Sequence, residues 1–407
     1  MKILLSSIGS RGDVQPVLAL ALELRAHGHD PRLCVAPNFK DWVESHGIAC
    51  IPIGPDLRKL TGGTAPKAAP PPPMAPSPEQ RRALAGQAVH SQFPVLLDAA
   101  RGCDLVIGGG ALQLATRSVT ESLGTRYVFA AYCPTVFPSP DHPPPKFGVH
   151  HSLSLTAEEN LALWAEEAQS WDALFGEALN DERAKLGLPP VDGVLRHVLT
   201  ERPWLAADPA LGPAGASDLQ LRQTGAWLLR DRTPLPEAVE RFLADGAPPV
   251  YLGFGSMRAT DETGRTLVEA ARSLGLRSIL SQGWGELAPI DAAGDCLSIG
   301  DVAHEALFPR VAAVVHHGGA GTTTAAARAG APQVIVPHNY DQPYWAHRVE
   351  ALGVGARGPA SDRLSVEEVV TALRTCLQPA TRARAQALAA RVQPDGARVA
   401  AELLTAP

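Results

Sequence analysis

The sequence lacks the features that mark several common protein classes. No run of lysine or arginine exceeds the pair Arg81-Arg82 and the net charge is −6, so no basic segment is available for nucleic acid. No apolar stretch reaches the roughly 18 residues that span a bilayer, and the opening MKILLSSIGS lacks the apolar core of a signal peptide. We therefore expect a cytoplasmic protein with no membrane span and no nucleic-acid partner.

Clustered cysteines are also missing, and the main glycine-rich loops do not match the common nucleotide motifs. The six cysteines are widely spaced and form no CxxC pair, which argues against a disulfide framework or a zinc site. The stretch HHGGAGTTT matches neither GxxxxGK[ST] nor GxGxxG, and GFGSM does not supply the GxGxxG fingerprint, so a P-loop NTPase and a nicotinamide-dependent dehydrogenase are both disfavoured.

The 407 residues instead predict two α/β domains. Short apolar strands alternate with helix-length segments, beginning with KILLSS and a helical pattern over 14–26, and the scheme restarts at PVYLGF. Such alternation is typical of doubly wound parallel sheets. We expect one domain at 1–204, a linker at 205–220, a second domain at 221–380 and a final helical stretch at 381–407.

Two proline-rich segments interrupt this pattern, at 66–78 and 134–145. Proline at this density excludes helix and central strand. The segments are either tolerated surface loops or the rim of a binding pocket, because long insertions at the ligand-binding edge of a sheet are often functional.

The strongest motif is AAVVHHGGAGTTTAAARAGAP at 312–332, a strand followed by two histidines, a glycine turn and a helix. Glycines 318, 319 and 321 allow close backbone approach, and the free N–H groups near Thr322 lie at the positive end of the helix dipole. His317, at the strand end, can add a hydrogen bond or a charge. These residues predict a phosphate-binding site.

Two acidic loops accompany this motif. Asp341 and Gln342 follow the next strand, and Asp13 lies in the first loop with Ser10 and Gly12. Each aspartate is either a helix cap or a functional group. In the functional interpretation Asp341 and Gln342 bind sugar hydroxyls, and Asp13 accepts a proton from an acceptor hydroxyl.

HHGGAGTT, PHNYDQPYWAHRV and IGSRGDVQPVLALALELRAHGHD together resemble the family 1 nucleotide-sugar glycosyltransferases of the GT-B fold, over nearly the whole chain. The nearest types are the bacterial natural-product enzymes, including glycopeptide-antibiotic glycosyltransferases, and the sterol glucosyltransferases. The resemblance implies two Rossmann-like domains facing across a central cleft. The N-terminal domain would bind the acceptor, the C-terminal domain the donor, and a C-terminal helix would cross back to the N-terminal domain.

The resemblance also implies residue roles. Asp13 would be the general base, acting without the histidine that plant members use, because His27 and His29 lie at the far end of the following helix. The plant tryptophan that stacks on the donor base has no counterpart in 298–308, which leaves Trp284 or backbone at Val302 for the base, or Trp284 as a packed aromatic. The residues expected to contact the donor are Ser10, Gly12, Ser256, Trp284, Val302, His317, Gly319, Ala320, Gly321, Thr322, Asp341 and Gln342.

The reaction implied is a direct displacement that inverts the anomeric carbon of a hexose, glucose in the simplest case, from a UDP- or dTDP-sugar. No DxD motif occurs, which agrees with catalysis without a metal or other cofactor. The acceptor would be a hydrophobic small molecule such as an antibiotic, polyketide or sterol, with Tyr132 and Phe137 among its contacts. Transfer of a dTDP-deoxysugar is the main alternative; an NDP-sugar epimerase and an inactive auxiliary partner are weaker ones.

Overall fold

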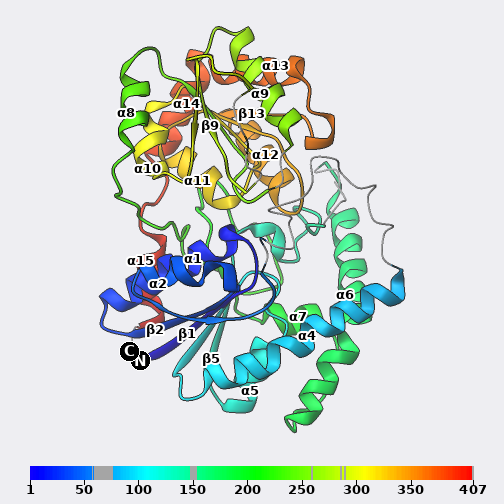
Figure 1. Cartoon of the computed structure of the whole chain (residues 1–407). Coiled ribbons are helices and arrows are strands. Elements are labelled where there is room, and N and C mark those ends of the chain that lie inside the picture. Colours follow the sequence, from blue (N-terminus) through cyan, green and yellow to red (C-terminus); the bar gives the residue numbers. More distant parts are fainter. Residues whose placement is uncertain are drawn as a thin grey trace.

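The computed structural model describes residues 1–56, 58, 77–146, 154–257, 260–284, 287 and 290–405. It contains two parallel sheets, one above the other in Figure 1. Most of the first proline-rich segment, residues 66–76, lies outside the described residues, whereas 134–145 is described. No helix in the described ranges is both long and apolar enough to cross a membrane.

The first sheet has the strand order β3-β2-β1-β4-β5-β6-β7 and every pairing in it is parallel. Its switch point lies between β1 and β4, whose connections leave in opposite directions. The strands are β1 (Lys2–Ser7), β2 (Asp30–Val35), β3 (Ala49–Pro52), β4 (Leu105–Gly109), β5 (Arg126–Ala131), β6 (Trp204–Leu205) and β7 (Arg222–Gln223).

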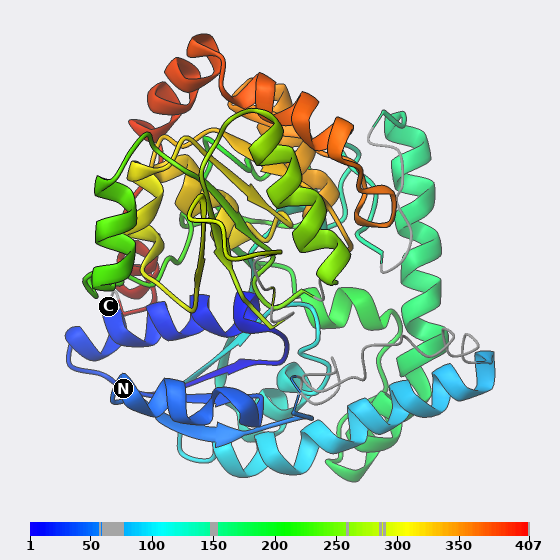
Figure 2. The ribbon, with the colours of Figure 1, turned by 45° about the horizontal axis from the view of Figure 1, so that its top comes forward.

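The helices of this half cover both faces of the sheet. In Figure 2, α4 and α6 pack against each other along the outside of this half of the molecule. The helix after β1 begins at Arg11, earlier than the apolar pattern from residue 14 indicates, because Ser10 and Asp13 cap its first turn. The helices are α1 (Arg11–Ala26), α2 (Lys40–Ser45), α4 (Pro78–Ala100), α5 (Thr116–Leu123), α6 (Ala157–Lys185) and α7 (Val194–Leu199).

The second sheet has the order β10-β9-β8-β11-β12-β13, the arrangement of dinucleotide-binding domains, with its switch point between β8 and β11. Its four central strands are fully buried, as expected for a parallel sheet covered on both faces. Its strands are β8 (Val250–Gly253), β9 (Ser278–Ser281), β10 (Cys296–Ile299), β11 (Ala313–His316), β12 (Gln333–Ile335) and β13 (Gly355–Arg357). Its helices are α8 (Glu237–Ala244), α9 (Asp261–Ser273), α10 (His304–Leu307), α11 (Ala320–Arg328), α12 (Gln342–Ala351) and α13 (Val366–Cys376).

Two sequence-based boundaries need correction. The predicted linker, 205–220, connects β6 to β7 inside the first sheet, so the passage to the second domain comes after Gln223. The predicted helical stretch from 381 is two helices, α14 (Pro379–Ala389) and α15 (Gly396–Thr405), separated around Pro394. Helix α14 contacts α11, and only α15 crosses back to pack on α1 (Figure 1).

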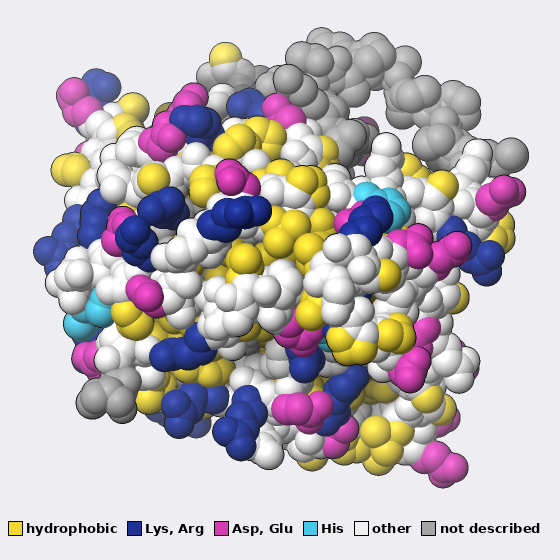
Figure 3. All heavy atoms as spheres, turned by 90° about the horizontal axis from the view of Figure 1, so that it is seen from below, with side chains coloured by type: hydrophobic (Ala, Val, Ile, Leu, Met, Phe, Trp, Pro, Cys, Tyr) yellow, Lys and Arg dark blue, Asp and Glu magenta, His cyan; other side chains and the backbone are white. Residues whose placement is uncertain are grey.

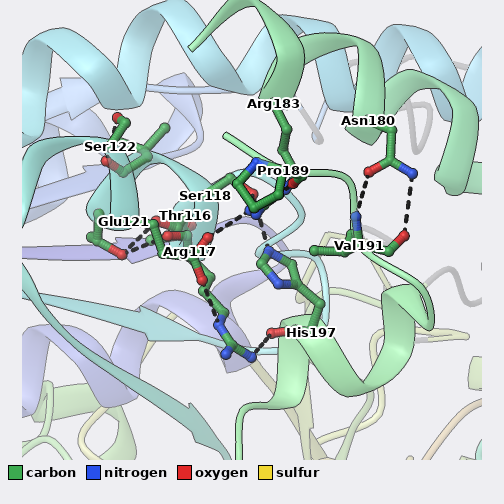
Figure 4. A network of polar contacts seen from close by, with 12 residues as sticks. Thr116, Arg117, Ser118, Glu121, Ser122, Asn180, Arg183, Pro189, Val191 and His197 are labelled. Carbon is green, nitrogen blue, oxygen red and sulfur yellow. Dashed lines mark hydrogen bonds and ion pairs between the residues drawn. The ribbon is translucent and has the colours of Figure 1, made fainter. Parts of the chain in front are cut away.

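A buried polar network joins α5, α6 and α7 (Figure 4). Arg183, 3% exposed, donates to Ser118 Oγ (2.9 Å), Glu121 Oε2 (2.6 Å) and the Pro189 carbonyl (2.9 Å). Ser118 Oγ also lies 3.0 Å from His197 Nε2. Burial first, and then Arg117, lower the pKa of His197 to about 4, which favours a neutral ring. Elsewhere on the first domain, seen from below in Figure 3, surface charges of both signs are intermingled.

Replacing Arg183 with methionine should lower the free energy of unfolding by about 2 kcal/mol, because three hydrogen bonds from a buried cation are lost. Urea unfolding measures the change. The matched control is Arg241→Met, which removes an exposed pair with Glu237 and should change stability by less than about 0.5 kcal/mol. Equal effects for the two variants would contradict the stabilising role of the network.

Candidate active site

The predicted site residues gather at the carboxyl ends of strands near both switch points. The Ser10–Asp13 loop follows β1, Ser256 follows β8, His317 follows β11 and Asp341 follows β12. In open α/β sheets ligands bind at such positions. The two sheets thus bring four loops from distant parts of the chain to the interface between the domains.

Asp13 both caps its own helix and carries a raised pKa. Its Oδ2 accepts from the backbone N–H of Ser10 at 2.7 Å and lies 3.2 Å from Ser10 Oγ, which in turn accepts from Gly12 N. Gly9 is required here, since a Cβ on it would lie 2.1 Å from Asp13 Oδ2. Burial raises the pKa of Asp13 to about 6, against the lowering effect of the Ser10 hydrogen bonds. The capping interpretation is confirmed, and it leaves a carboxylate that titrates near neutral pH.

Two side-chain hydrogen bonds to the Asp13 carbonyl hold the turn that carries this residue. Ser7 Oγ donates to the Asp13 carbonyl at 2.9 Å, and the Tyr132 hydroxyl donates to the same carbonyl at 3.1 Å. Tyr132, expected at the acceptor, thus has its hydroxyl engaged by α1. Phe137 is 1% exposed and packs edge-on against Phe129. We expected Phe137 to contact the acceptor, but it is a core residue.

The two histidines of the glycine motif have different environments. His316 is fully buried; its Nδ1 accepts from Gly318 N at 3.1 Å, so its Nε2–H donates to Gln333 Oε1 at 2.9 Å. His317 is half-buried, and its Nδ1 has no hydrogen-bond partner in the described part of the chain. Burial first, and then His316 and His338, lower the pKa of His317 to about 3. Of the two roles expected for His317, a hydrogen bond or a charge, the lowered pKa favours a hydrogen bond from a neutral ring.

Helix α11 begins without a side-chain cap and without an acidic residue in its first turn. Gly319 is at the N-cap, so the N–H groups of the following residues have no intrahelical acceptor. Gly318 has φ +94°, and a Cβ there would lie 2.6 Å from Ile335 Cγ2. The turn therefore needs glycine, and it exposes the positive end of α11 beside His317.

The side chains of Asp341 and Gln342 have different hydrogen-bond partners and different capacity to bind a ligand. Asp341 makes no capping bond; its Oδ2 accepts from the Trp345 indole at 2.8 Å, and burial raises its pKa to about 6, with a further contribution from Asp13. That contribution shows that the two carboxylates, from different domains, are electrostatically close. Gln342 is 6% exposed, and its Oε1 accepts from the N–H groups of residues 338 and 339. Its amide nitrogen donates to Met257 Sδ at 3.7 Å, which leaves its second hydrogen for a ligand.

Tyr340, which sequence reasoning missed, precedes this pair in a left-handed conformation with φ +61°. Non-glycine residues rarely adopt it, and such strain persists at functional sites where the surroundings impose it. Here Gln342 imposes it by binding the two N–H groups just before Tyr340. No composition or spacing signal in a single sequence marks such a position.

The remaining donor candidates lie on loops after β8, β9 and β10. Gly255, beside Ser256, accepts from Trp284 N at 2.8 Å, and a Cβ on it would lie 3.4 Å from His317 Cε1. Ser256 and Val302 are half-buried. Trp284 is the packed aromatic of the two alternatives, because its ring stacks on Phe39 of the first domain at 5.9 Å and 26°.

Comparison with known proteins identifies the class. Residues 3–104 match the glycosyltransferase family 28 N-terminal domain, and 294–405 match the erythromycin biosynthesis protein CIII-like C-terminal domain. The chain is 43% identical to vancomycin aglycone glucosyltransferase and 39% identical to dTDP-epi-vancosaminyltransferase, both of Amycolatopsis orientalis. These alignments cover 99% and 95% of this chain and 97% and 92% of the relatives.

The glycosyltransferase of kitacinnamycin has the same fold, with a TM-score of 0.71 and 20% identity over 99% of this chain and 98% of that one. The protein is thus an enzyme, a glycosyltransferase with the two Rossmann-like domains of the GT-B fold. It belongs to the family of bacterial antibiotic glycosyltransferases.

Gly321 gives a test that separates folding from anion binding. A Cβ on Gly321 meets nothing within 4 Å and the residue is exposed in α11, so Gly321→Ala should keep or raise stability, by up to about 1 kcal/mol. The added methyl group would occupy space at the helix N-terminus, so affinity for a nucleoside diphosphate should fall. Gly318→Ala, by contrast, should destabilise the fold. Urea unfolding and calorimetric titration measure both effects, and unchanged affinity in Gly321→Ala would place the diphosphate elsewhere.

Proposed function

We propose that the enzyme transfers a hexose, glucose in the simplest case, from a UDP- or dTDP-sugar to a hydroxyl of a hydrophobic small-molecule acceptor, with inversion and without a metal. The observation that carries this proposal is the pairing across the domain interface of a carboxylate with a raised pKa, Asp13, and an uncapped helix N-terminus beside a neutral histidine, His317. The first suits proton removal and the second suits an anionic leaving group.

The donor diphosphate is proposed to lie at the start of α11. The leaving group gains negative charge as the glycosidic bond breaks, and preorganised N–H donors stabilise that charge without moving. The backbone from Gly319 to Thr322 supplies these donors, and neutral His317 adds a ring N–H. Ser10, Gly12 and Ser256 approach from the facing loops. This proposal requires no metal ion to bind the phosphates.

The acceptor oxygen attacks the anomeric carbon while the bond from that carbon to the phosphate oxygen breaks, which inverts the configuration. The acceptor proton passes to Asp13. An aspartate with an ordinary pKa near ~3.9 is a weak base, and burial that raises the pKa of Asp13 to about 6 makes it a better one. On the donor side Asp341 accepts from a sugar hydroxyl, and the amide nitrogen of Gln342 donates to another.

The choice of donor and acceptor follows the relatives. The similarity to vancomycin aglycone glucosyltransferase supports transfer of glucose to a natural-product acceptor. The similarity to dTDP-epi-vancosaminyltransferase supports the alternative, transfer of a dTDP-deoxysugar. The 134–145 segment supports an acceptor site in the first domain, because it meets α12 just beyond Asp341: the rings of His142 and Tyr344 lie 6.1 Å apart. We propose that this segment borders the acceptor.

Calorimetric titration with UDP, dTDP and NAD, in the presence of EDTA, tests the donor class. We expect binding of UDP or dTDP and none of NAD. His317→Ala should weaken that binding about tenfold or more, as expected for a lost hydrogen bond to a charged group. The matched control is His27→Ala, at the far end of α1, which should bind like the wild type. Tight binding of NAD, or wild-type affinity in His317→Ala, would contradict the proposal.

The pH dependence of kcat tests Asp13. The base must be deprotonated, so kcat should fall as the pH drops through the pKa of Asp13, about 6. Asp13→Asn should lower kcat by about 10²- to 10⁴-fold with donor binding intact. Asp341→Asn removes a nearby negative charge and should move the midpoint of any residual activity to lower pH. Turnover near the wild-type level in Asp13→Asn across this range would exclude the base role.

A further inference from the structure

Arg11 lies in the first turn of α1, directly between Ser10 and Gly12, yet its side chain reaches the other domain. Its Nη1 lies 2.5 Å from Asp301 Oδ2, in the loop that follows β10. On its own domain the guanidinium lies over the Trp42 ring, 4.9 Å from the centroid. Arg11 therefore connects the turn that carries Asp13 to the donor-domain loop that carries Val302.

A second contact crosses the interface beside the first. Phe39, 5% exposed, stacks on Trp284 of the donor domain at 5.9 Å and 26°. Trp42 packs edge-on against Phe39 at 6.2 Å and so touches both connections. The five residues form a continuous series in the order Asp301, Arg11, Trp42, Phe39, Trp284.

The donor-domain end of this series at Trp284 is held directly to the loop of Gly255 and Ser256. The backbone N–H of Trp284 donates to the Gly255 carbonyl, and a Cβ on Gly283 would lie 2.4 Å from that same oxygen. Gln282 N donates to the Ile299 carbonyl, which ties the loop after β9 to the loop after β10. Displacement of Trp284 would therefore move the loop of Gly255 and Ser256 relative to His317, and Asp301 lies in the loop that is tied to the loop of Trp284.

We propose that Arg11, Phe39, Trp42, Trp284 and Asp301 form an interdomain clamp that positions the donor loops against the turn of Asp13. The proposal rests on the glycosyl transfer proposed above and assigns its members as positioning residues, not catalytic ones. The aromatic stack buries apolar surface and supplies the attraction. The Arg11–Asp301 pair is exposed, so it contributes little stability and instead fixes the register between the domains.

The clamp gives Trp284 a role in packing between the domains rather than as a platform for the donor base. One face of its ring is occupied by Phe39, and its backbone is fixed by Gly255. If holding the domains together is its role, an aromatic substitute retains function: Trp284→Phe should behave nearly like the wild type, whereas Trp284→Ala should not.

Charge exchange tests the ion pair. Arg11→Asp and Asp301→Arg should each raise the KM for the donor and lower kcat, by about fivefold or more in kcat/KM, because like charges then face each other. The double variant restores the pair with reversed polarity and should recover most of the loss. The matched control is the same exchange at Arg241 and Glu237, an exposed pair on α8, which should leave kinetics unchanged. Absence of recovery in the double variant, with unfolding midpoints like the wild type, would overturn the ion-pair part of the proposal.

Small-angle X-ray scattering provides a readout that does not depend on activity. Trp284→Ala and Arg11→Asp should increase the radius of gyration, and the double charge exchange should return it to the wild-type value. If the wild type transfers no sugar from any UDP or dTDP donor, the proposed function fails while the scattering still tests the clamp. Unchanged scattering in both single variants would overturn the clamp even in an active enzyme.

Discussion

The burial of a carboxylate in the first turn of α1 is the constraint on which the rest of the site depends. Asp13 caps the N-terminus of α1 together with Ser10, so the hydrogen bonds that start the helix also fix the orientation of the carboxylate. Ser7 and Tyr132 hold the turn from below through the Asp13 carbonyl. Each of these contacts restricts motion without neutralising the charge, and desolvation is left to raise the pKa.

The contrast between two helix N-termini gives the site its polarity. Helix α1 begins with a capping box, in which Asp13 accepts from Ser10 N and Ser10 Oγ accepts from Gly12 N, whereas α11 begins with glycines and no cap. The first therefore presents a carboxylate to the interface and the second presents unpaired donors. Because burial keeps His317 neutral, the anion site depends on oriented dipoles, which require no counter-ion before a ligand arrives.

Local sequence signals predicted the strands, the glycine turn and the loops that bear Asp13, His317 and Asp341, because each depends on residues close together in the chain. Pro394 and Gly396, which disfavour a continuous helix, also mark the break between α14 and α15 in the sequence. The linker was misplaced because β7 has only two residues, too few to show a periodic pattern in the sequence. The contacts of Phe39 with Trp284 and of Arg11 with Asp301 depend on residues distant in sequence, and no spacing rule reveals them.

Close backbone and side-chain packing also joins the domains where the chain passes from one to the other. A Cβ on Gly396 would lie 2.4 Å from the Gly225 carbonyl carbon, where the two interdomain crossings of the chain meet, and Gln393 N donates to buried Asp208. Nearby, a Cβ on Gly212 would lie 2.7 Å from the Trp345 ring, and Trp345 also binds Asp341. Contacts this close permit little sliding, so relative motion of the domains reduces to rotation about this region. Such a rotation changes the distance between Asp13 and the donor-binding loops, so contacts between the loops of the two domains, such as those of Arg11 and Phe39, are needed to set that distance.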